Sequence, residues 1–371
     1  MINQSGIISK ILKNYNLCEY CAGRLTSKLS GKSSSKFLGR KHLEKYGKRS
    51  HNKCYVCKNI FDTLDIMLSQ IYDKTSDIDF KTFNIGLILK PSFLERDDFL
   101  KSRFKIKGVE NIKYAISTEL AKKISRKTKS ERIVDNPDLF IQVNFKENFC
   151  SVKTKPLFVY GRYTKKIRKL PQKQKRNPDG NFLKKVSSDS IEARISDFFT
   201  KKFFASQVRI NWIGGEDQSS LVIGNGRPFF VKIINPKKRH SLLRKNSNLD
   251  SIVLSELRKL SIQPKGSIPF RSEVLVTVDT KVSISLEKLE KLKILQNAII
   301  KNPLNKKNDN KRIYRISYKK IKETTFLLEL VLDGGIPIKS IIQNSNISPN
   351  ISEILGISCK CKEFTFKNIL I

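Results

Sequence analysis

Apolar residues recur along this chain with two different spacings, and each spacing predicts a type of element. In residues 59–74, "NIFDTLDIMLSQIYDK", they recur every three or four positions, which predicts a helix. The same spacing predicts a second helix over 111–125, "NIKYAISTELAKKIS". Strict alternation in 80–89, "FKTFNIGLIL", and in 137–145, "PDLFIQVNF", predicts strands. A strand, a helix and a strand in this order indicate a small α/β binding module.

Two further alternating stretches, "SQVRINWI" (206–213) and "PFFVKIINP" (228–236), predict strands on either side of a glycine-rich segment. That segment, "GGEDQSSLVIGNGRPFF" (214–230), contains the adjacent acids Glu216 and Asp217. No Gly-Lys-Ser/Thr follows, which excludes a P-loop, and one acidic pair offers too few oxygens for a calcium loop. What remains is a carboxylate on a turn between strands, kept charged by nearby cations and available as a nucleophile or a base.

The composition points to a polyanionic partner. The 371 residues carry 73 Lys and Arg against 34 Asp and Glu, a net charge of +39 spread over the whole length. Such a distribution favours nucleic acid, with an anionic membrane surface as the second candidate. A hydrophobic content of 39% is enough for two or three cores. No apolar run approaches a membrane span or a secretory signal, so we expect an intracellular protein of the nucleus or cytoplasm.

Four of the seven cysteines form two pairs of the Cys-x-x-Cys type. Cys18 and Cys21 stand in "LCEYCAGRL", and Cys54 and Cys57 stand in "KCYVCKNIFD". Two such knuckles turn four thiolates toward one tetrahedral ion, which predicts a structural zinc site closed to substrate. The polar, basic segment between the pairs is either a solvated insert or a contact for the RNA backbone. The other three cysteines we interpret as structural.

Basic and aromatic residues are interleaved in 155–175, "KPLFVYGRYTKKIRKLPQKQK". Cations bind phosphates while rings stack on bases, so this pattern is typical of a surface that binds a nucleic-acid strand. The alternative is an edge strand followed by a solvated linker. The candidate RNA-binding residues are Tyr160, Arg162, Tyr163, Lys165, Lys166, Arg168 and Lys169.

Several of these motifs, in the same order, resemble those of one family, the archaeal and eukaryotic Pus-ten family of tRNA pseudouridine synthases. The resemblance covers "LCEYCAGRL", "CYVCKNIFD", "PLFVYGRYTKKIRKLPQ", "GGEDQSSLVIGNGRPF" and "GGIPIKSII…SPNISEILG". It implies a mixed α/β, or α+β, chain: a zinc module at 1–76, a THUMP-like RNA-binding domain at 77–165, and a catalytic domain with a mixed, mainly antiparallel sheet at 166–371.

The resemblance also assigns roles to residues. It implies that Asp217 is the nucleophile or base for a flipped-out uridine, and that Lys339 pairs with it. Ile338 and Leu355 are expected to line the base pocket, and Arg227 to contact RNA. The implied substrate is tRNA, with uridine 55 or uridine 54 of the T loop as the target. No organic cofactor, catalytic metal or obligate protein partner is implied.

The chain departs from the family motif at several positions. Gly215, Ser219 and Leu221 stand where the family has Arg, Asp and Arg. The family's active-site tyrosine aligns either with Ser272 or, after a shift of two residues, with Phe270, which would line the substrate pocket as a stacking ring. Two functions are therefore open: an active tRNA pseudouridine synthase, or a catalytically degenerate homologue that binds and remodels tRNA.

Overall fold

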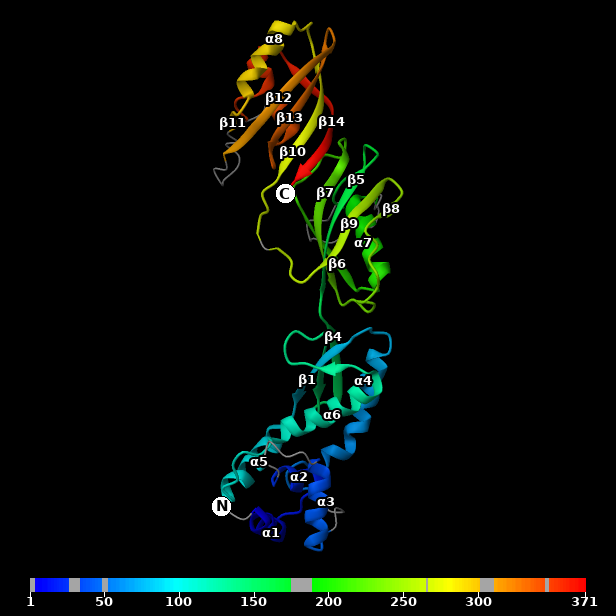
Figure 1. Ribbon diagram of the computed structural model, residues 1–371, viewed down its shortest axis with the longest axis vertical. Helices are drawn as coiled ribbons and strands as arrows, with labels where there is room; N and C mark the ends of the chain where they lie inside the picture. Colours follow the sequence, from blue (N-terminus) through cyan, green and yellow to red (C-terminus); the bar gives the residue numbers. More distant parts are fainter. Residues whose placement is uncertain are drawn as a thin grey trace. The chain divides into compact units, whose positions relative to one another are not determined.

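The computed structural model describes residues 4–26, 34–48, 53–174, 189–264, 266–300, 310–343 and 347–371. The chain divides into two compact units. Unit 1 comprises Met1–Lys155 with Lys237–His240, and unit 2 comprises Pro156–Pro236 with Ser241–Ile371. Figure 1 follows the chain through both units by colour.

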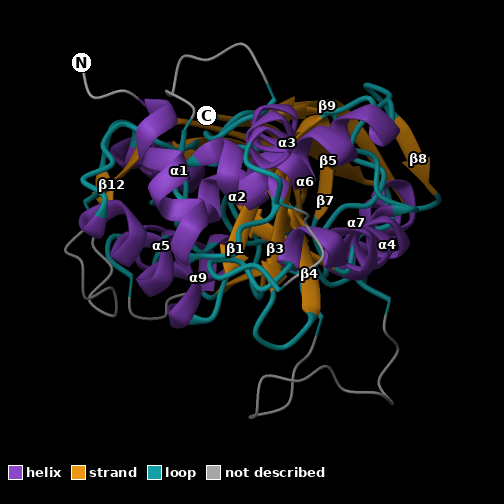
Figure 2. Ribbon diagram, turned by 90° about the horizontal axis from the view of Figure 1, so that it is seen from below, coloured by secondary structure: helices purple, strands orange, loops and turns teal. Residues whose placement is uncertain are grey.

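Unit 1 combines helices with a four-stranded sheet of order β2-β1-β3-β4. The strand β1 pairs in parallel with β2 and β3, and β3 pairs antiparallel with β4; Figure 2 shows β1, β3 and β4 side by side. The two helices and two strands predicted from periodicity are confirmed as α4, α6, β1 and β3. The elements of unit 1 are α1 (Gln4–Asn14), α2 (Glu19–Arg24), α3 (Ser35–Lys45), η1 (Ile60–Thr63), α4 (Leu64–Thr75), β1 (Thr82–Ile88), α5 (Pro91–Arg103), α6 (Ile112–Thr128), β2 (Glu131–Arg132), β3 (Leu139–Asn144) and β4 (Phe149–Thr154).

A single hydrophobic core runs through unit 1. It extends from Ile8 in α1, through the buried Cys54 and Cys57, to Ile116 in α6 and Val143 in β3. The module expected at 1–76 and the domain expected from 77 onward therefore share one core. Parts of the basic segment between the cysteine pairs, 27–33 and 49–52, lie outside the described residues.

Unit 2 is built on a ten-stranded sheet of order β11-β12-β13-β10-β14-β7-β5-β9-β8, with β6 also paired to β7. The pairings are antiparallel except for β14 with β7, as expected for a mixed, mainly antiparallel sheet. The buried face of α7 packs into the core of this sheet. The elements of unit 2 are β5 (Leu157–Lys165), α7 (Ile191–Phe203), β6 (Gln207–Trp212), β7 (Leu221–Ile234), β8 (Ser247–Leu249), β9 (Ile252–Leu260), β10 (Arg271–Thr280), α8 (Leu286–Glu290), η2 (Lys291–Leu295), β11 (Ile299–Ile300), β12 (Lys311–Lys322), β13 (Thr325–Asp333), α9 (Ile338–Gln343), α10 (Ile351–Leu355) and β14 (Cys359–Leu370).

The boundary between the units lies about ten residues before the one expected at 165/166, at Lys155/Pro156. The reason is the pairing of β5, which forms ladders with β7 on one side and β9 on the other. Strand β5 is thus a central strand of unit 2, neither an edge strand nor part of the THUMP-like domain. Conversely, Lys237–His240 belong to unit 1, where the Arg239 guanidinium lies 3.1 Å from the Asp138 carboxylate.

The glycine-rich segment contains less loop than its sequence suggests. Strand β7 already begins at Leu221, so only 213–220 form the connection from β6. Gly226 lies within β7 at a φ of +73°, where a Cβ would lie 2.6 Å from the carbonyl oxygen of Tyr163. A glycine there lets β7 approach β5 closely while the backbone adopts a left-handed conformation.

Candidate active site

The structure brings Asp217 and Lys339, 122 residues apart in sequence, into contact. Asp217 lies on the connection from β6 to β7, and Lys339 lies in the first turn of α9. The Lys339 ammonium donates a hydrogen bond of 2.8 Å to Oδ2 of Asp217. The Asp217 side chain is 33% exposed and the Lys339 side chain is 46% exposed, so solvent reaches the ion pair.

The other carboxylate oxygen of Asp217 is held by its own turn. Oδ1 accepts hydrogen bonds from the backbone N–H of Ser219 at 2.8 Å and from the Ser219 hydroxyl at 2.5 Å. Partial burial opposes ionisation, but the hydrogen bonds from Lys339 and Ser219 prevail and lower the pKa of Asp217 to about 2. The carboxylate is therefore charged at neutral pH. Ser219, one of the departures from the family motif, is a direct partner of Asp217.

A buried ionic cluster lies beneath this turn. The Glu216 carboxylate is 3.1 Å from the Lys165 ammonium and 3.4 Å from Nε of Arg227, and all three side chains have no exposed surface. Lys165 also donates to the backbone carbonyl of Asp217 at 3.3 Å, and Arg227 donates to that of Ile213 at 3.0 Å. Side chains from β5 and β7 thus form hydrogen bonds with backbone carbonyls at both ends of the glycine-rich turn.

Tyr163 completes the cluster from β5. Its side chain is fully buried, and its hydroxyl accepts a hydrogen bond of 3.1 Å from the Gln172 amide. Burial and the neighbouring Glu216 carboxylate raise the pKa of Tyr163 well above its usual range, so the phenol is neutral. The expectation that Tyr163, Lys165 and Arg227 contact RNA does not fit this burial: their side chains bind the protein's own turn.

The other residues of 155–175 that are predicted to bind RNA are divided between the interior and the surface. Arg162 is buried and donates to the carbonyls of Gly226 at 2.8 Å and Ile369 at 2.9 Å. Tyr160 is also buried, and its hydroxyl accepts from Nε of Arg162. Arg168 is half-buried and donates to the carbonyl of Ser219 at 2.6 Å. The remaining two predicted residues, Lys166 and Lys169, are exposed.

Of the three residues expected to line the base pocket, Ile338 lies on α9 and Leu355 on α10, and Phe270 directly precedes β10. Ile338 precedes Lys339 and is 5% exposed, and Leu355 at the end of α10 is 3% exposed. Both belong to the main core of unit 2, so they support α9 from the apolar side. The Phe270 ring is half-buried and packs beside Ile213, next to the turn that carries Asp217. Ser272 is buried within β10.

In unit 1, the ligand atoms of Cys18, Cys21, Cys54 and Cys57 all lie within 4.8 Å of one another. Tetrahedral zinc with Zn–S bonds of about 2.3 Å requires sulfur–sulfur distances of about 3.8 Å, so the four thiols fit such an ion. The Arg24 guanidinium lies 3.8 Å from Sγ of Cys21 and would offset part of the charge of four thiolates. Three of the thiols are buried and one is partly buried, which makes this a closed cluster that could hold a metal ion.

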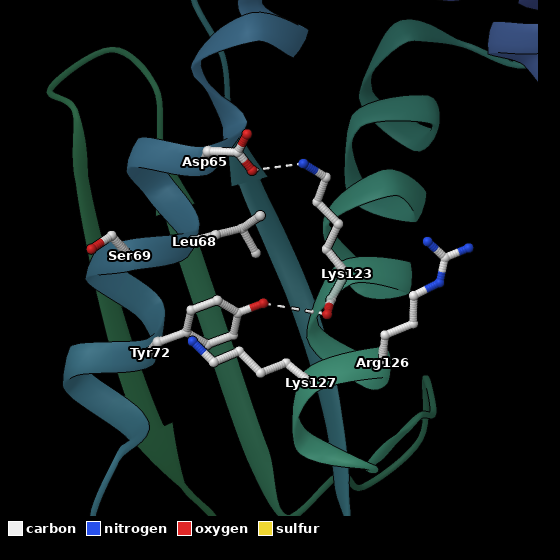
Figure 3. Close-up of a pocket in the computed structure, with 7 residues that line it drawn as sticks. All are labelled: Asp65, Leu68, Ser69, Tyr72, Lys123, Arg126 and Lys127. Atoms are coloured by element: carbon white, nitrogen blue, oxygen red, sulfur yellow. Dashed lines mark hydrogen bonds and ion pairs between the residues drawn. The ribbon is translucent and has the colours of Figure 1, made fainter.

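A basic groove runs between α4 and α6 of unit 1 (Figure 3). Lys123 and Lys127 reach from α6 toward α4, where the Lys123 ammonium lies 2.6 Å from Asp65 and that of Lys127 lies 3.8 Å from the centre of the Tyr72 ring. With Arg126 the groove carries three cations against one carboxylate. Its volume is about 590 Å³, and its lining residues are Asp65, Leu68, Ser69, Tyr72, Lys123, Arg126 and Lys127.

The sequence places the chain in a known family. Residues 158–369 match the family described as "Pus10, C-terminal", and residues 67–144 match "Pus10 THUMP domain, archaeal". The chain is 41% identical over 98% of its length to the tRNA pseudouridine synthase Pus10 of Nitrosopumilus maritimus, and covers 97% of that protein. The chain belongs to the Pus10 family of tRNA pseudouridine synthases.

A second relative has a lower identity to this chain. The protein of the same name from Pyrococcus furiosus is 30% identical over 95% of this chain and 94% of its own length. Among solved structures, a chain in the archaeal box H/ACA sRNP Nop10-Cbf5 complex is 12% identical over 56% of this chain and 47% of its own, with a TM-score of 0.29, which is too low to support a conclusion. None of the helices in the described residues has the length and apolar character needed to cross a bilayer.

Proposed function

We propose that this protein isomerises a T-loop uridine of tRNA, uridine 55 or uridine 54, to pseudouridine, with Asp217 as the nucleophile or base. In the reaction the bond between N1 of uracil and C1′ of ribose breaks, the base rotates, and a bond forms between C5 and C1′. C5 loses a proton and N1 gains one, so the reaction is an isomerisation that needs no co-reactant. The uracil base must leave the base stack before a protein side chain can reach it, so the uridine is flipped out of the RNA.

The observation that carries this proposal is the 2.8 Å contact between Lys339 and Asp217. A carboxylate whose two oxygens are both engaged, and whose pKa is lowered to about 2, is charged whenever a uridine arrives. The Lys339 ammonium offsets the negative charge, and the exposed edge of the pair leaves room for substrate. Ile338 and Leu355 supply the apolar side of the site, and Phe270 lies close enough to the turn to act with them.

We also propose that zinc is the ion held by the four cysteines. Four thiolates leave no open coordination position, so the role of the ion is to stabilise unit 1 and not to take part in the reaction. The cluster lies within the unit 1 core, where the ion would fix α2 against the 54–57 knuckle.

For tRNA binding we propose the cations that remain exposed. In unit 2 these include Lys166 and Lys169, and in unit 1 they include Arg126 and Lys127 of the α4–α6 groove, together with the partly exposed Lys123. A groove that combines ammonium and guanidinium groups with an aromatic ring suits an RNA strand, because the cations bind phosphates and the ring can stack on a base.

The deciding experiment is an assay on unmodified tRNA transcript, with pseudouridine mapped by carbodiimide-dependent reverse-transcription stops. Wild type should give one equivalent of pseudouridine in the T loop, and Asp217→Asn, which is nearly isosteric, should give none while still binding tRNA. Asp197→Asn, the same change in an exposed carboxylate on α7 of the same unit, is the matched control and should retain activity. A wild type that binds tRNA tightly but forms no pseudouridine would favour the degenerate tRNA-binding homologue instead.

A further inference from the structure

The Phe270 ring fills the space between two glycines of unit 2. A Cβ built on Gly214 would lie 2.3 Å from Cζ of Phe270, and one built on Gly334 would lie 2.3 Å from both Cε1 and Cζ. Real Cβ atoms essentially never approach other atoms this closely. The ring therefore occupies the volume that a side chain at either position would take, and it contacts both backbones directly.

The Arg227 guanidinium shares the space over Gly214 with the ring. The same Cβ on Gly214 would lie 2.9 Å from Nη1 of Arg227, and the Arg227 guanidinium lies 4.5 Å from the centre of the Phe366 ring. Phe366, Arg227, Gly214, Phe270 and Gly334 thus form a continuous packed series. At its end the backbone N–H of Gly334 donates a hydrogen bond of 2.7 Å to the carbonyl of Phe270.

The two glycines begin the two segments that carry the ion pair. Gly214 lies three residues before Asp217, and Gly334 lies five residues before Lys339. We propose that Phe270 is a positioning residue that holds these two segments at the separation at which Asp217 meets Lys339. The inference rests on the proposed function, but differs from the stacking role expected for the family's aromatic residue, because here the ring acts on the protein backbone.

The ion pair needs such support. Half-exposed ion pairs contribute little net free energy, so Lys339 and Asp217 do not hold the two segments together by their own attraction. Misplacing a reacting group by about 1 Å costs on the order of 100-fold in rate. A rigid aromatic ring between two glycines fixes the separation by contact, which is how a site is preorganised on a packed scaffold.

Gly334→Ala is the sharpest test, because Gly334 does not have a positive φ and the three atoms nearest to an added Cβ all belong to the Phe270 ring. We expect kcat for pseudouridine formation to fall about 10-fold to 100-fold, while the tRNA KM stays within about twofold. In a Phe270→Ala background the ring is gone, so adding Gly334→Ala should lower kcat and Tm much less than it does in wild type. Phe270→Leu tests the same ring without changing a glycine and should lower kcat in the same way.

Phe198→Leu is the matched control, since Phe198 is also half-buried against the unit 2 core but lies on α7. It should change kcat less than about twofold. The inference is overturned if Gly334→Ala costs as much kcat in the Phe270→Ala background as in wild type. It is also overturned if the substitutions raise KM and leave kcat unchanged, which would make the ring an RNA contact. A wild type inactive on tRNA would overturn the proposed function and the positioning role with it, whereas coupled Tm losses would still report the ring contact.

Discussion

Each unit of this protein buries charged or ligating groups, but the two units use them differently. In unit 1 four thiols lie next to the buried Arg24, which forms an ion pair with the buried Asp97. In unit 2 the buried Glu216 is neutralised by Lys165 and Arg227. The first cluster is closed, whereas the second supports a turn whose Asp217 remains one-third exposed. Buried groups form part of a closed core in one case and support a partly exposed carboxylate in the other.

The largest effect should come from the closed cluster. Cys54→Ser removes one of four ligands, and structural zinc contributes on the order of 10 kcal/mol to the folding of small zinc modules. We expect bound zinc to fall from one equivalent to nearly none and unit 1 to unfold at a much lower temperature. Elemental analysis and a thermal melt measure both quantities.

Cys150→Ser is the control for this substitution, because Cys150 is buried in the same core but lies outside the cluster. It should retain full zinc and lose far less stability. Finding no zinc in wild type, or equal melting temperatures for the two variants, would contradict a metal-stabilised core.

A smaller loss is expected when the cluster of unit 2 is broken. Glu216→Gln leaves Lys165 and Arg227 buried without a carboxylate, and removing one partner of a buried ion pair costs about 3–5 kcal/mol of the free energy of unfolding. Glu256→Gln is the matched change: its carboxylate lies 3.5 Å from Arg162 but is 51% exposed, so the cost should be under about 1 kcal/mol. Urea unfolding curves compare the two; similar losses would mean that the buried cluster is not a stability centre.

The two clusters also differ in how much of each could be predicted from the sequence. The four-cysteine cluster could be predicted because its spacing is local: the two cysteines of each pair are three residues apart. Asp217 stood out as an acidic residue between predicted strands. The partners of Glu216 could not be recognised, because Lys165 and Arg227 become interior only when β5 pairs with β7. In the sequence they look like any other cations of a chain with a net charge of +39.

Long-range relations explain the remaining differences. Lys339 was expected beside Asp217 only through the family resemblance, since no local pattern joins residues 122 positions apart. The expected boundary at 165/166 differs from the boundary between the two compact units, because an alternating strand does not reveal which sheet it joins. Glu216 and Ser219 were missed as partners of the site, although both lie within two residues of Asp217; their proximity in sequence was the available signal.

If the cations beneath the turn of unit 2 are unavailable to RNA, exposed cations must supply the tRNA contacts. The triple variant Lys123→Glu, Arg126→Glu and Lys127→Glu should weaken tRNA binding about 10-fold to 100-fold and reduce the slope of log K against log[salt] by about 2. The control triple, Lys288→Glu, Lys291→Glu and Lys293→Glu, changes the net charge equally at exposed positions on α8 and η2. Filter binding at several salt concentrations separates them, and equal losses would show that only total charge matters.

The smallest effect concerns the ion pair itself. Because the pKa of folded Asp217 is lowered from an ordinary 3.8 to about 2, the pair adds stability above about pH 4 and loses it as the pH falls toward about 2. Lys339→Met removes the main cause of the lowered pKa. The free energy of unfolding of wild type should therefore exceed that of the variant by less than about 1 kcal/mol at pH 6, and by less still in acid. Lys166→Met removes the charge of another exposed lysine, at the residue that follows β5. Its difference in stability from wild type should not become smaller in acid. Urea unfolding from pH 6 downward tests this; a difference that grows in acid would mean that Lys339 does not stabilise the ionised carboxylate.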